Sequence, residues 1–318
     1  MHIPDGFLSL PVATGTAVLA IAGLAIAIRD VKNNLPEKKV PLLGLAAAFI
    51  FAAQMLNFPV AAGTSGHLTG ATLATVLLGP SAAVIVISAV LILQCLMFAD
   101  GGITALGANI FNLAVVVPVV SYVIYRFIIG FGTSSNAEPD LFKKLLAILI
   151  AAWISIVAAS IFCAFELALS NAAALQLVLP AMSGVHMVIG LGEAAITAFV
   201  IANIVRLRPD LLGSSSYVNN TADNERSFFA LGLIVSLALA IFVSPFASSS
   251  PDGLEFVAEQ LGFIASATNL LTQAPLPDYS VPGIESLMID SLLVGLIGTL
   301  SAFVFAWFFA RWLSAPNT

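Results

Sequence analysis

Long runs of hydrophobic residues, separated by short polar stretches, make up most of this chain. Nine such segments can be marked, over residues 8–28, 41–57, 67–79, 81–99, 104–126, 143–168, 184–205, 228–245 and 288–313. Most of them approach the roughly 20 residues with which an α-helix crosses a bilayer. The alternating segments of about 10 residues that mark a membrane β-barrel are not seen. The pattern therefore predicts an all-α polytopic membrane protein.

The third segment, 67–79, is short, and Gly79-Pro80 separates it from the fourth by a tight turn. Two interpretations stay open for it. It either crosses the membrane fully, or it is re-entrant, because non-helical backbone is tolerated at membrane depth where protein buries it.

The positions of the basic residues predict the orientation. With nine spans and an extracytoplasmic N-terminus, all eleven Lys and Arg residues fall on the cytoplasmic side. A re-entrant hairpin over the third and fourth segments preserves this parity. The N-terminus lacks the basic start of a signal peptide, so we expect it to be mature sequence. The C-terminus is predicted to be cytoplasmic, in the inner or plasma membrane.

Composition narrows the class of protein further. Hydrophobic residues make up 60% of the chain and charged residues 9%, against about 25% charged in soluble domains. Nothing in the sequence resembles the basic patch of a nucleic-acid-binding protein. Cys95 and Cys163 lie in apolar runs without metal-type spacing and are interpreted as core residues.

A polar stretch divides the chain into two parts. Residues 209–227 are rich in Ser and Asn and are predicted to form a flexible cytoplasmic linker between a domain of residues 1–208 and a two-helix module of residues 228–318. We call the latter the C-terminal module. Its loop, over about 246–287, contains five acids and no base, and is predicted to face outward.

The three histidines, His2, His67 and His186, all fall near the outer surface in this topology. His2 has the greatest chemical potential. The amine of Met1, the backbone nitrogen of His2 and its Nδ1 atom can close two chelate rings on one metal ion, with three nitrogens in a plane. Ni²⁺ favours such a square-planar nitrogen site, and His67 could fill the fourth corner. Taken alone, each histidine also has an ordinary structural interpretation.

Two acids lie inside apolar segments. Glu166 and Glu193 are costly at membrane depth and therefore candidates for function, as orienting groups, proton relays or interhelical partners. Glu193 lies on nearly the same helical face as His186, and we consider all three as possible outer-shell residues of a metal site. The sequence lacks the Walker A motif of ATPases and the HExxH and GxSxG motifs of hydrolases, so we expect a transporter subunit without its own ATPase, and no enzyme.

The opening Met1-His2-Ile3-Pro4-Asp5-Gly6-Phe7-Leu8-Ser9 resembles the start of the CbiM/NikM family, the substrate-binding S components of cobalt and nickel energy-coupling factor (ECF) transporters. The stretches 63–70, 98–109 and 184–194 resemble the same family, so the similarity covers about residues 1–208. Residues 251–255, Pro-Asp-Gly-Leu-Glu, resemble the PDGLE domain of the NikN-type subunit, here fused to its partner.

This resemblance implies an S-component helical bundle with an extra N-terminal helix, and a metal site made by Met1, His2 and His67. It implies a transmembrane coupling subunit and ABC-type ATPase subunits as partners, with Ni²⁺ or Co²⁺ as the transported substrate and no resident cofactor. The fusion favours nickel without deciding it. The alternative that stays open is a stand-alone secondary permease for divalent metal, for which Glu166 and Glu193 are the only supporting features.

Overall fold

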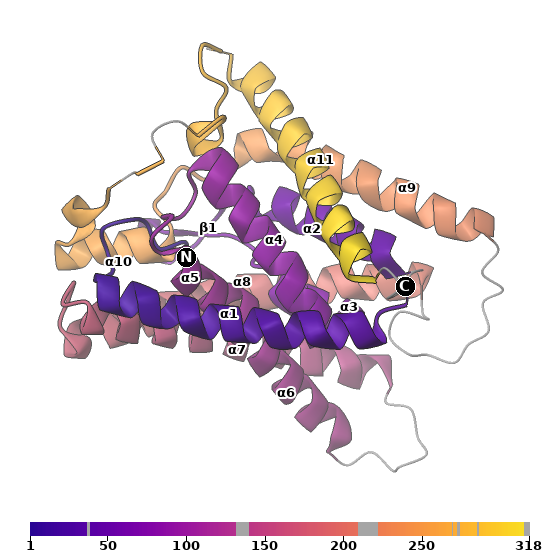
Figure 1. The fold of residues 1–318 in the computed structure, drawn as a ribbon, viewed down its shortest axis with the longest axis horizontal. Coiled ribbons are helices and arrows are strands. Elements are labelled where there is room, and N and C mark those ends of the chain that lie inside the picture. The colour runs from indigo at the N-terminus through magenta and orange to yellow at the C-terminus, as the bar shows by residue number, and fades with distance from the viewer. Residues whose placement is uncertain are drawn as a thin grey trace.

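The computed structural model describes residues 1–36, 39–131, 140–208, 222–268, 270–271, 274–284 and 286–314. Within these ranges the chain is a bundle of helices with one small two-stranded sheet (Figure 1). Seven helices among the described residues are long and apolar enough to cross a membrane. They are α1 (Leu10–Asn34), α4 (Pro80–Phe98), the continuous helix of α5 (Leu106–Asn109), η3 (Ile110–Val116) and α6 (Val117–Gly130), α7 (Leu141–Leu169), α8 (Leu175–Leu207), α9 (Ala222–Ala238) with its extensions η5 (Leu239–Val243) and η6 (Ser244–Phe246), and α11 (Leu287–Ser314).

Two of the nine predicted segments form shorter helices. Helix α2 (Val40–Gln54) has 15 residues and α3 (Ala71–Leu78) has 8. At 1.5 Å per residue, α3 is about 12 Å long, so it cannot cross a hydrocarbon core of about 30 Å. Gly70 and Gly79, with φ of 70° and 90°, bound it. Of the two interpretations left open for 67–79, a full helical span does not fit α3, and this segment begins as buried extended backbone.

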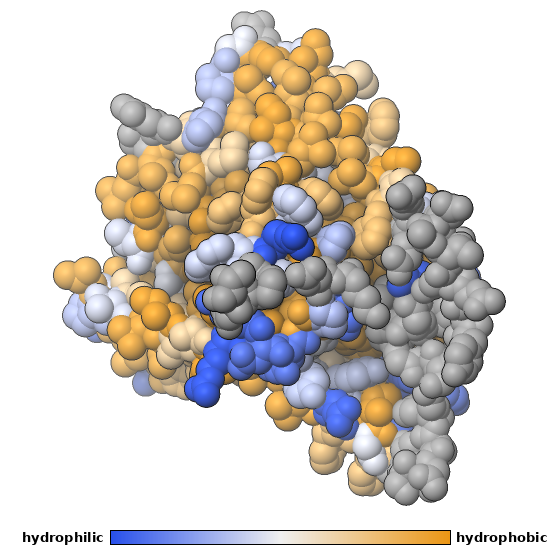
Figure 2. All heavy atoms as spheres, turned by 45° about the vertical axis from the view of Figure 1, so that its right-hand side comes forward, coloured by the Kyte–Doolittle hydropathy of each residue, from blue (hydrophilic) through white to orange (hydrophobic). Residues whose placement is uncertain are grey.

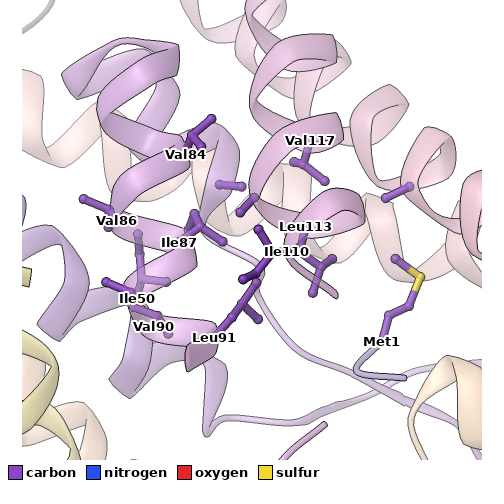
Figure 3. Packing of buried hydrophobic residues seen from close by; sticks show 14 of the residues in the cluster. Met1, Ile50, Val84, Val86, Ile87, Val90, Leu91, Ile110, Leu113 and Val117 are labelled. Atoms are coloured by element: carbon purple, nitrogen blue, oxygen red, sulfur yellow. The ribbon is translucent and has the colours of Figure 1, made fainter. Parts of the chain in front are cut away.

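The core lies where α4 and the wide π-helical turn η3 pack together. Figure 3 shows Ile87 and Leu91 of α4 against Ile110 and Leu113 of η3, with the Met1 side chain reaching the same buried cluster. Cys95 and Cys163 are buried, as predicted, and neither forms a disulfide bond. The face shown in Figure 2 is broadly hydrophobic, with the most hydrophilic side chains concentrated in its lower centre. That distribution suits a protein surrounded by lipid.

The C-terminal module belongs to the same bundle. Helix α11 packs along α2 so closely that a Cβ atom on Gly298 would lie 2.2 Å from the Phe51 ring. Its loop carries α10 (Gly253–Leu261) onto α8. Of the predicted linker, residues 209–221 lie outside the described residues, whereas residues 222–227 are the first residues of α9.

The basic helix ends gather at one end of the bundle. Lys32 in the last turn of α1, Arg206 in that of α8 and Arg311 in that of α11 lie at the end away from α10 (Figure 1). These three basic ends therefore lie at one end of the bundle, as the positive-inside rule leads one to expect. The assignment of this end to the cytoplasm stays a prediction.

Candidate metal centre

The first residues of the chain are held in an extended path by backbone hydrogen bonds. The Ile3 N–H donates to Oδ1 of Asn109 at 2.8 Å, and its carbonyl accepts from Nδ2 of the same side chain at 3.1 Å. The Gly102 N–H donates to the Ile3 carbonyl at 2.9 Å. Because Asn109 offers a donor and an acceptor together, it replaces the neighbouring strand that an extended segment needs.

Two glycines let other backbone approach this segment closely. A Cβ atom on Gly102 would lie 2.2 Å from the Asp5 nitrogen, and one on Gly6, at φ 89°, would lie 2.1 Å from the Ser266 carbonyl oxygen. The Asp5 carboxylate also accepts from the Thr104 N–H at 2.8 Å and from its hydroxyl at 2.5 Å. The stretch 98–109 therefore packs closely against the first residues of the chain through Gly102. The loop of the C-terminal module packs against them from Ser266.

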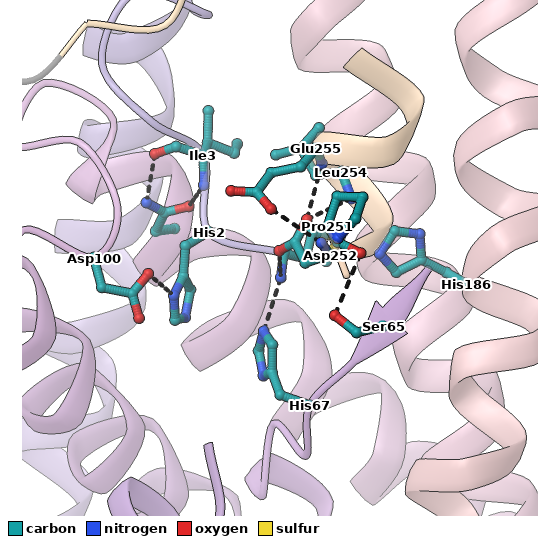
Figure 4. Close-up of polar contacts among 12 residues, drawn as sticks. His2, Ile3, Ser65, His67, Asp100, His186, Pro251, Asp252, Leu254 and Glu255 are labelled. Carbon is teal, nitrogen blue, oxygen red and sulfur yellow. Dashed lines mark hydrogen bonds and ion pairs between the residues drawn. The ribbon is translucent and has the colours of Figure 1, made fainter. Parts of the chain in front are cut away.

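This path buries the amine of Met1 beside His67. The amine nitrogen lies 2.9 Å from Nε2 of His67 and 2.8 Å from Oδ2 of Asp252 (Figure 4). The rings of His2 and His67 lie 5.2 Å apart, centroid to centroid. The structure thus brings together the three residues predicted to bind metal, although His67 lies 66 positions after Met1 along the chain.

The His2 ring is turned toward Asp100. Its Nδ1 donates to Oδ1 of Asp100 at 2.6 Å, and Oδ2 of the same carboxylate accepts from the Tyr279 hydroxyl at 2.5 Å. Tyr279 belongs to the C-terminal module and stacks on Phe98 with centroids 4.7 Å apart. The Nε2 atom of His2 is buried without a hydrogen-bond partner among the described residues. In this arrangement the Nδ1 atom that the predicted chelate requires is occupied by Asp100.

The electrostatics keep the imidazole of His67 neutral. Burial, followed by the positive charges of the Met1 amine and His2, lowers the pKa of His67 to about 3. Burial tends to raise the pKa of Asp252, but the charge and hydrogen bond of the Met1 amine outweigh it and hold that pKa well below its usual range. A neutral imidazole has a free electron pair, which is the form that binds metal.

The Pro-Asp-Gly-Leu-Glu motif of the C-terminal module is built around this amine. One oxygen of Asp252 caps α10 by accepting from the N–H groups of Leu254 and Glu255, at 2.8 and 2.9 Å, and Glu255 accepts from the Asp252 N–H at 3.0 Å. This is a capping box. Because one Asp252 oxygen is fixed on the helix, the other is held in place for the amine.

The other motif residues dock α10 on the bundle. The Pro251 carbonyl accepts from the N–H of Ser65 at 2.8 Å, in β2 (Ser65–Gly66), which pairs with β1 (Phe58–Pro59). A Cβ atom on Gly253 would lie 2.9 Å from Cε1 of His186. The motif therefore ties the amine to the strand that precedes His67.

The three residues predicted as an outer shell have different positions. His186 donates from Nδ1 to the Met182 carbonyl at 2.8 Å and packs under Gly253. Glu193 accepts from the N–H of Thr69, at 3.1 Å, and from its hydroxyl, which holds the backbone two residues after His67. Glu166 accepts from Nδ2 of Asn112 at 2.7 Å, between helices. Glu193 and His186 thus support the centre indirectly, whereas no hydrogen bond or ion pair joins Glu166 to it among the described residues.

Sequence reasoning missed the direct roles of Asp100, Asp252 and Tyr279. The Asp-x-x-Glu spacing at 252–255 is a recognisable capping signal, but nothing in it indicates that Asp252 meets the N-terminus. No three His, Cys, Asp or Glu side chains converge on a metal-sized space in the described ranges. A metal held here would need the amine and backbone nitrogen as well as the imidazoles.

The sequence matches two known protein families and several metal transport proteins. Residues 2–211 match the family model of the cobalt uptake substrate-specific transmembrane region, CbiM, and residues 226–315 match that of the PDGLE domain. The chain is 39% identical over 302 residues to a putative fused nickel transport protein NikMN of Archaeoglobus fulgidus, covering 94% of this chain and 95% of that one.

Two further likenesses, one to a curated protein and one to a solved structure, agree with this family. A fused nickel transport protein NikMN of Rhodobacter capsulatus is 32% identical over 330 residues, with 94% of both chains covered. The crystal structure of a truncated transition metal transporter, 35% identical, superposes with a TM-score of 0.57 and covers 65% of this chain and 99% of that one.

Proposed function

We propose that this chain, which belongs to the CbiM family of cobalt-uptake transmembrane regions and is a multi-pass membrane transport protein with a PDGLE domain, captures Ni²⁺ or Co²⁺ for an ATP-driven importer of the energy-coupling factor type. The observation that carries the proposal is the buried Met1 amine, 2.9 Å from Nε2 of His67, with His2 as its covalent neighbour. These groups supply the nitrogen ligands that late first-row metals prefer.

Metal capture needs one local movement. The His2 ring turns so that Nδ1 leaves Asp100 and joins the Met1 amine and the His2 backbone nitrogen on the metal. His67 completes the square through Nε2. The Met1 amine and the His2 amide lose protons to the solvent as the metal binds, because only deprotonated nitrogen is a ligand. The proton that Nδ1 of His2 donates to Asp100 also leaves that atom, so the metal-bound ring carries its proton on Nε2. The relatives that match over 94% of this chain are named as fused nickel transport proteins, which favours nickel as the cargo.

Inward release requires partner subunits. A site built from a buried amine and imidazoles holds its metal tightly, so work must be done to open it toward the cytoplasm. We infer that a transmembrane coupling subunit and ABC-type ATPase subunits supply that work by reorienting this chain in the membrane. The metal site then faces the extracytoplasmic side at rest, with the C-terminus in the cytoplasm.

The test compares this chain alone with the full set of subunits in sealed vesicles. Accumulation of radiolabelled Ni²⁺ should require the coupling subunit, the ATPase subunits and ATP. The rival function is a secondary permease driven by an ion gradient. Its candidate acids are engaged with Thr69 and Asn112, which is a structural use of both. Uptake by the chain alone, without ATP, would favour the permease and contradict the proposal.

A further inference from the structure

A polar cavity adjoins the candidate metal centre on the side of the C-terminal module. Its volume is about 530 Å³, and both His2 and His67 line it. A divalent ion with six waters needs about 200 Å³, at roughly 30 Å³ for each water. The cavity is therefore large enough to admit the metal with its hydration shell, before any ligand nitrogen replaces a water.

The lining carries negative charge and no compensating base. Its carboxylates come from both parts of the chain, and no Lys or Arg is among the lining residues that the structure describes; the acids are Asp5, Asp100, Asp252, Glu255 and Asp278. The first three accept the hydrogen bonds described above. Glu255 uses one oxygen in the capping box, and the Asp278 carboxylate has no hydrogen bond to the described part of the chain. These two have oxygens to offer to a cation.

A second observation is independent of charge. Gln54, at the end of α2, lines the cavity and is 6% exposed. Its Nε2 donates to the Thr69 carbonyl at 2.8 Å, which fixes the amide group, yet its Oε1 finds no partner among the described residues. A buried amide oxygen left unpaired is costly, and water or a hydrated cation in the cavity would satisfy it. Gln54 thus adds a fixed neutral oxygen to the lining of the cavity that Glu255 and Asp278 share.

We propose that this cavity is a waiting site for a hydrated divalent cation, held by oxygen atoms of Glu255, Asp278 and Gln54 through its waters, from which the metal passes to the nitrogen ligands. The inference rests on the proposed function and adds a step before it. Oxygen ligands also suit Mg²⁺ and Mn²⁺, so the waiting site collects divalent cations without choosing among them. Selection for nickel then belongs to the nitrogen site alone.

The double variant Glu255→Gln/Asp278→Asn tests this step with little risk to the fold. Gln serves in a capping box as Glu does, and Asn tolerates the left-handed backbone of Asp278, at φ 51° and ψ 33°. The matched control is Glu259→Gln, which removes one charge from the exposed face of the same helix, outside the cavity lining. Loading is followed with radiolabelled Ni²⁺ and a chelator quench at low ionic strength.

The double variant should load about tenfold more slowly than the control, at the lower end of the effect of electrostatic focusing, and reach the same final occupancy. Millimolar Mg²⁺ should slow the unmodified protein and the control but not the double variant. Equal loading rates in the double variant and the control would overturn the waiting site while leaving the proposed function intact.

A second measurement does not depend on the nitrogen ligands. In a protein with one residue added before Met1, Mn²⁺ titrated by electron paramagnetic resonance should still bind, and the Glu255→Gln/Asp278→Asn substitutions should abolish that binding. If the extended protein binds no Mn²⁺, the waiting site is wrong even where nickel capture by the unmodified protein is established.

Discussion

The imidazole of His67 meets the Met1 amine through Nε2, which makes it the first residue to substitute. His67→Ala removes one of four proposed nitrogen ligands. We expect nickel affinity to fall by at least about a hundredfold, more than the 10–100-fold typical of losing an outer-shell partner. His186→Ala is the control, because that ring packs under Gly253 and donates to the Met182 carbonyl. The nickel affinity of this variant should stay within several-fold of that of the unmodified protein. Isothermal calorimetry measures both, and equal losses would point to His186 as a ligand.

The lowered pKa of His67 also predicts how acid affects the metal-free protein. The unfolded chain binds a proton near pH 6.5, whereas the folded chain does so only near pH 3, so stability is lost as pH falls below about 6.5. At pH 5 the loss is about 2 kcal/mol, from 1.36 kcal/mol per pH unit. Thermal unfolding in detergent should show a larger drop between pH 7 and pH 5 for the unmodified protein than for His67→Ala. Parallel drops would contradict the burial of a neutral imidazole.

How well each residue of the centre could be predicted depends on how far along the chain its partner lies. Met1 and His2 could be chosen from the sequence because their chelate depends on covalent neighbours. His67 was a candidate for the fourth corner, and the family resemblance singled it out. Asp100 and Asp252 could not be chosen in the same way. Their contacts with His2 and Met1 cross 98 and 251 positions of the chain, and no local pattern encodes such a pairing.

Among the elements, α10 links the C-terminal module to the centre through its N-cap. Asp252→Asn keeps the capping oxygen but replaces the charged oxygen by an N–H₂ group, which is a donor facing the donor amine. We expect a loss of roughly tenfold or more in nickel affinity, the scale of an outer-shell partner, with the helix retained. Glu259→Gln removes a carboxylate from the same helix without touching the amine. Similar affinities for the two variants would show that α10 does not position Met1.

The hydrophobic pattern predicted the long helices well because each is a continuous apolar run with polar ends. It left 67–79 undecided, and there Gly70 and Gly79 limit the helix to α3. It could not show how α10 docks either. That docking depends on a close approach between Gly253 and His186, and such a contact is decided by the packed bundle as a whole.

For the whole molecule, orientation in the membrane is the property to test. Ala265 is exposed in the loop of the C-terminal module, and Asn33 is exposed at the far end of α1, whereas Cys95 and Cys163 are buried. In intact cells, a membrane-impermeant thiol reagent should label Ala265→Cys and not Asn33→Cys, which should react only after the cells are opened. The reverse pattern would place the candidate centre on the cytoplasmic side.

The most direct test of the central claim is nickel binding by the protein with its Met1 amine free, compared with the same protein carrying one added residue before Met1. The addition turns the amine into an amide and moves it from its position between His67 and Asp252, and no side-chain motion restores the lost chelate ring. We expect high-affinity binding, with the diamagnetic signature of square-planar nickel, in the first protein alone, while both remain folded by thermal unfolding. Equally tight binding by the extended protein would contradict the Met1–His2 chelate.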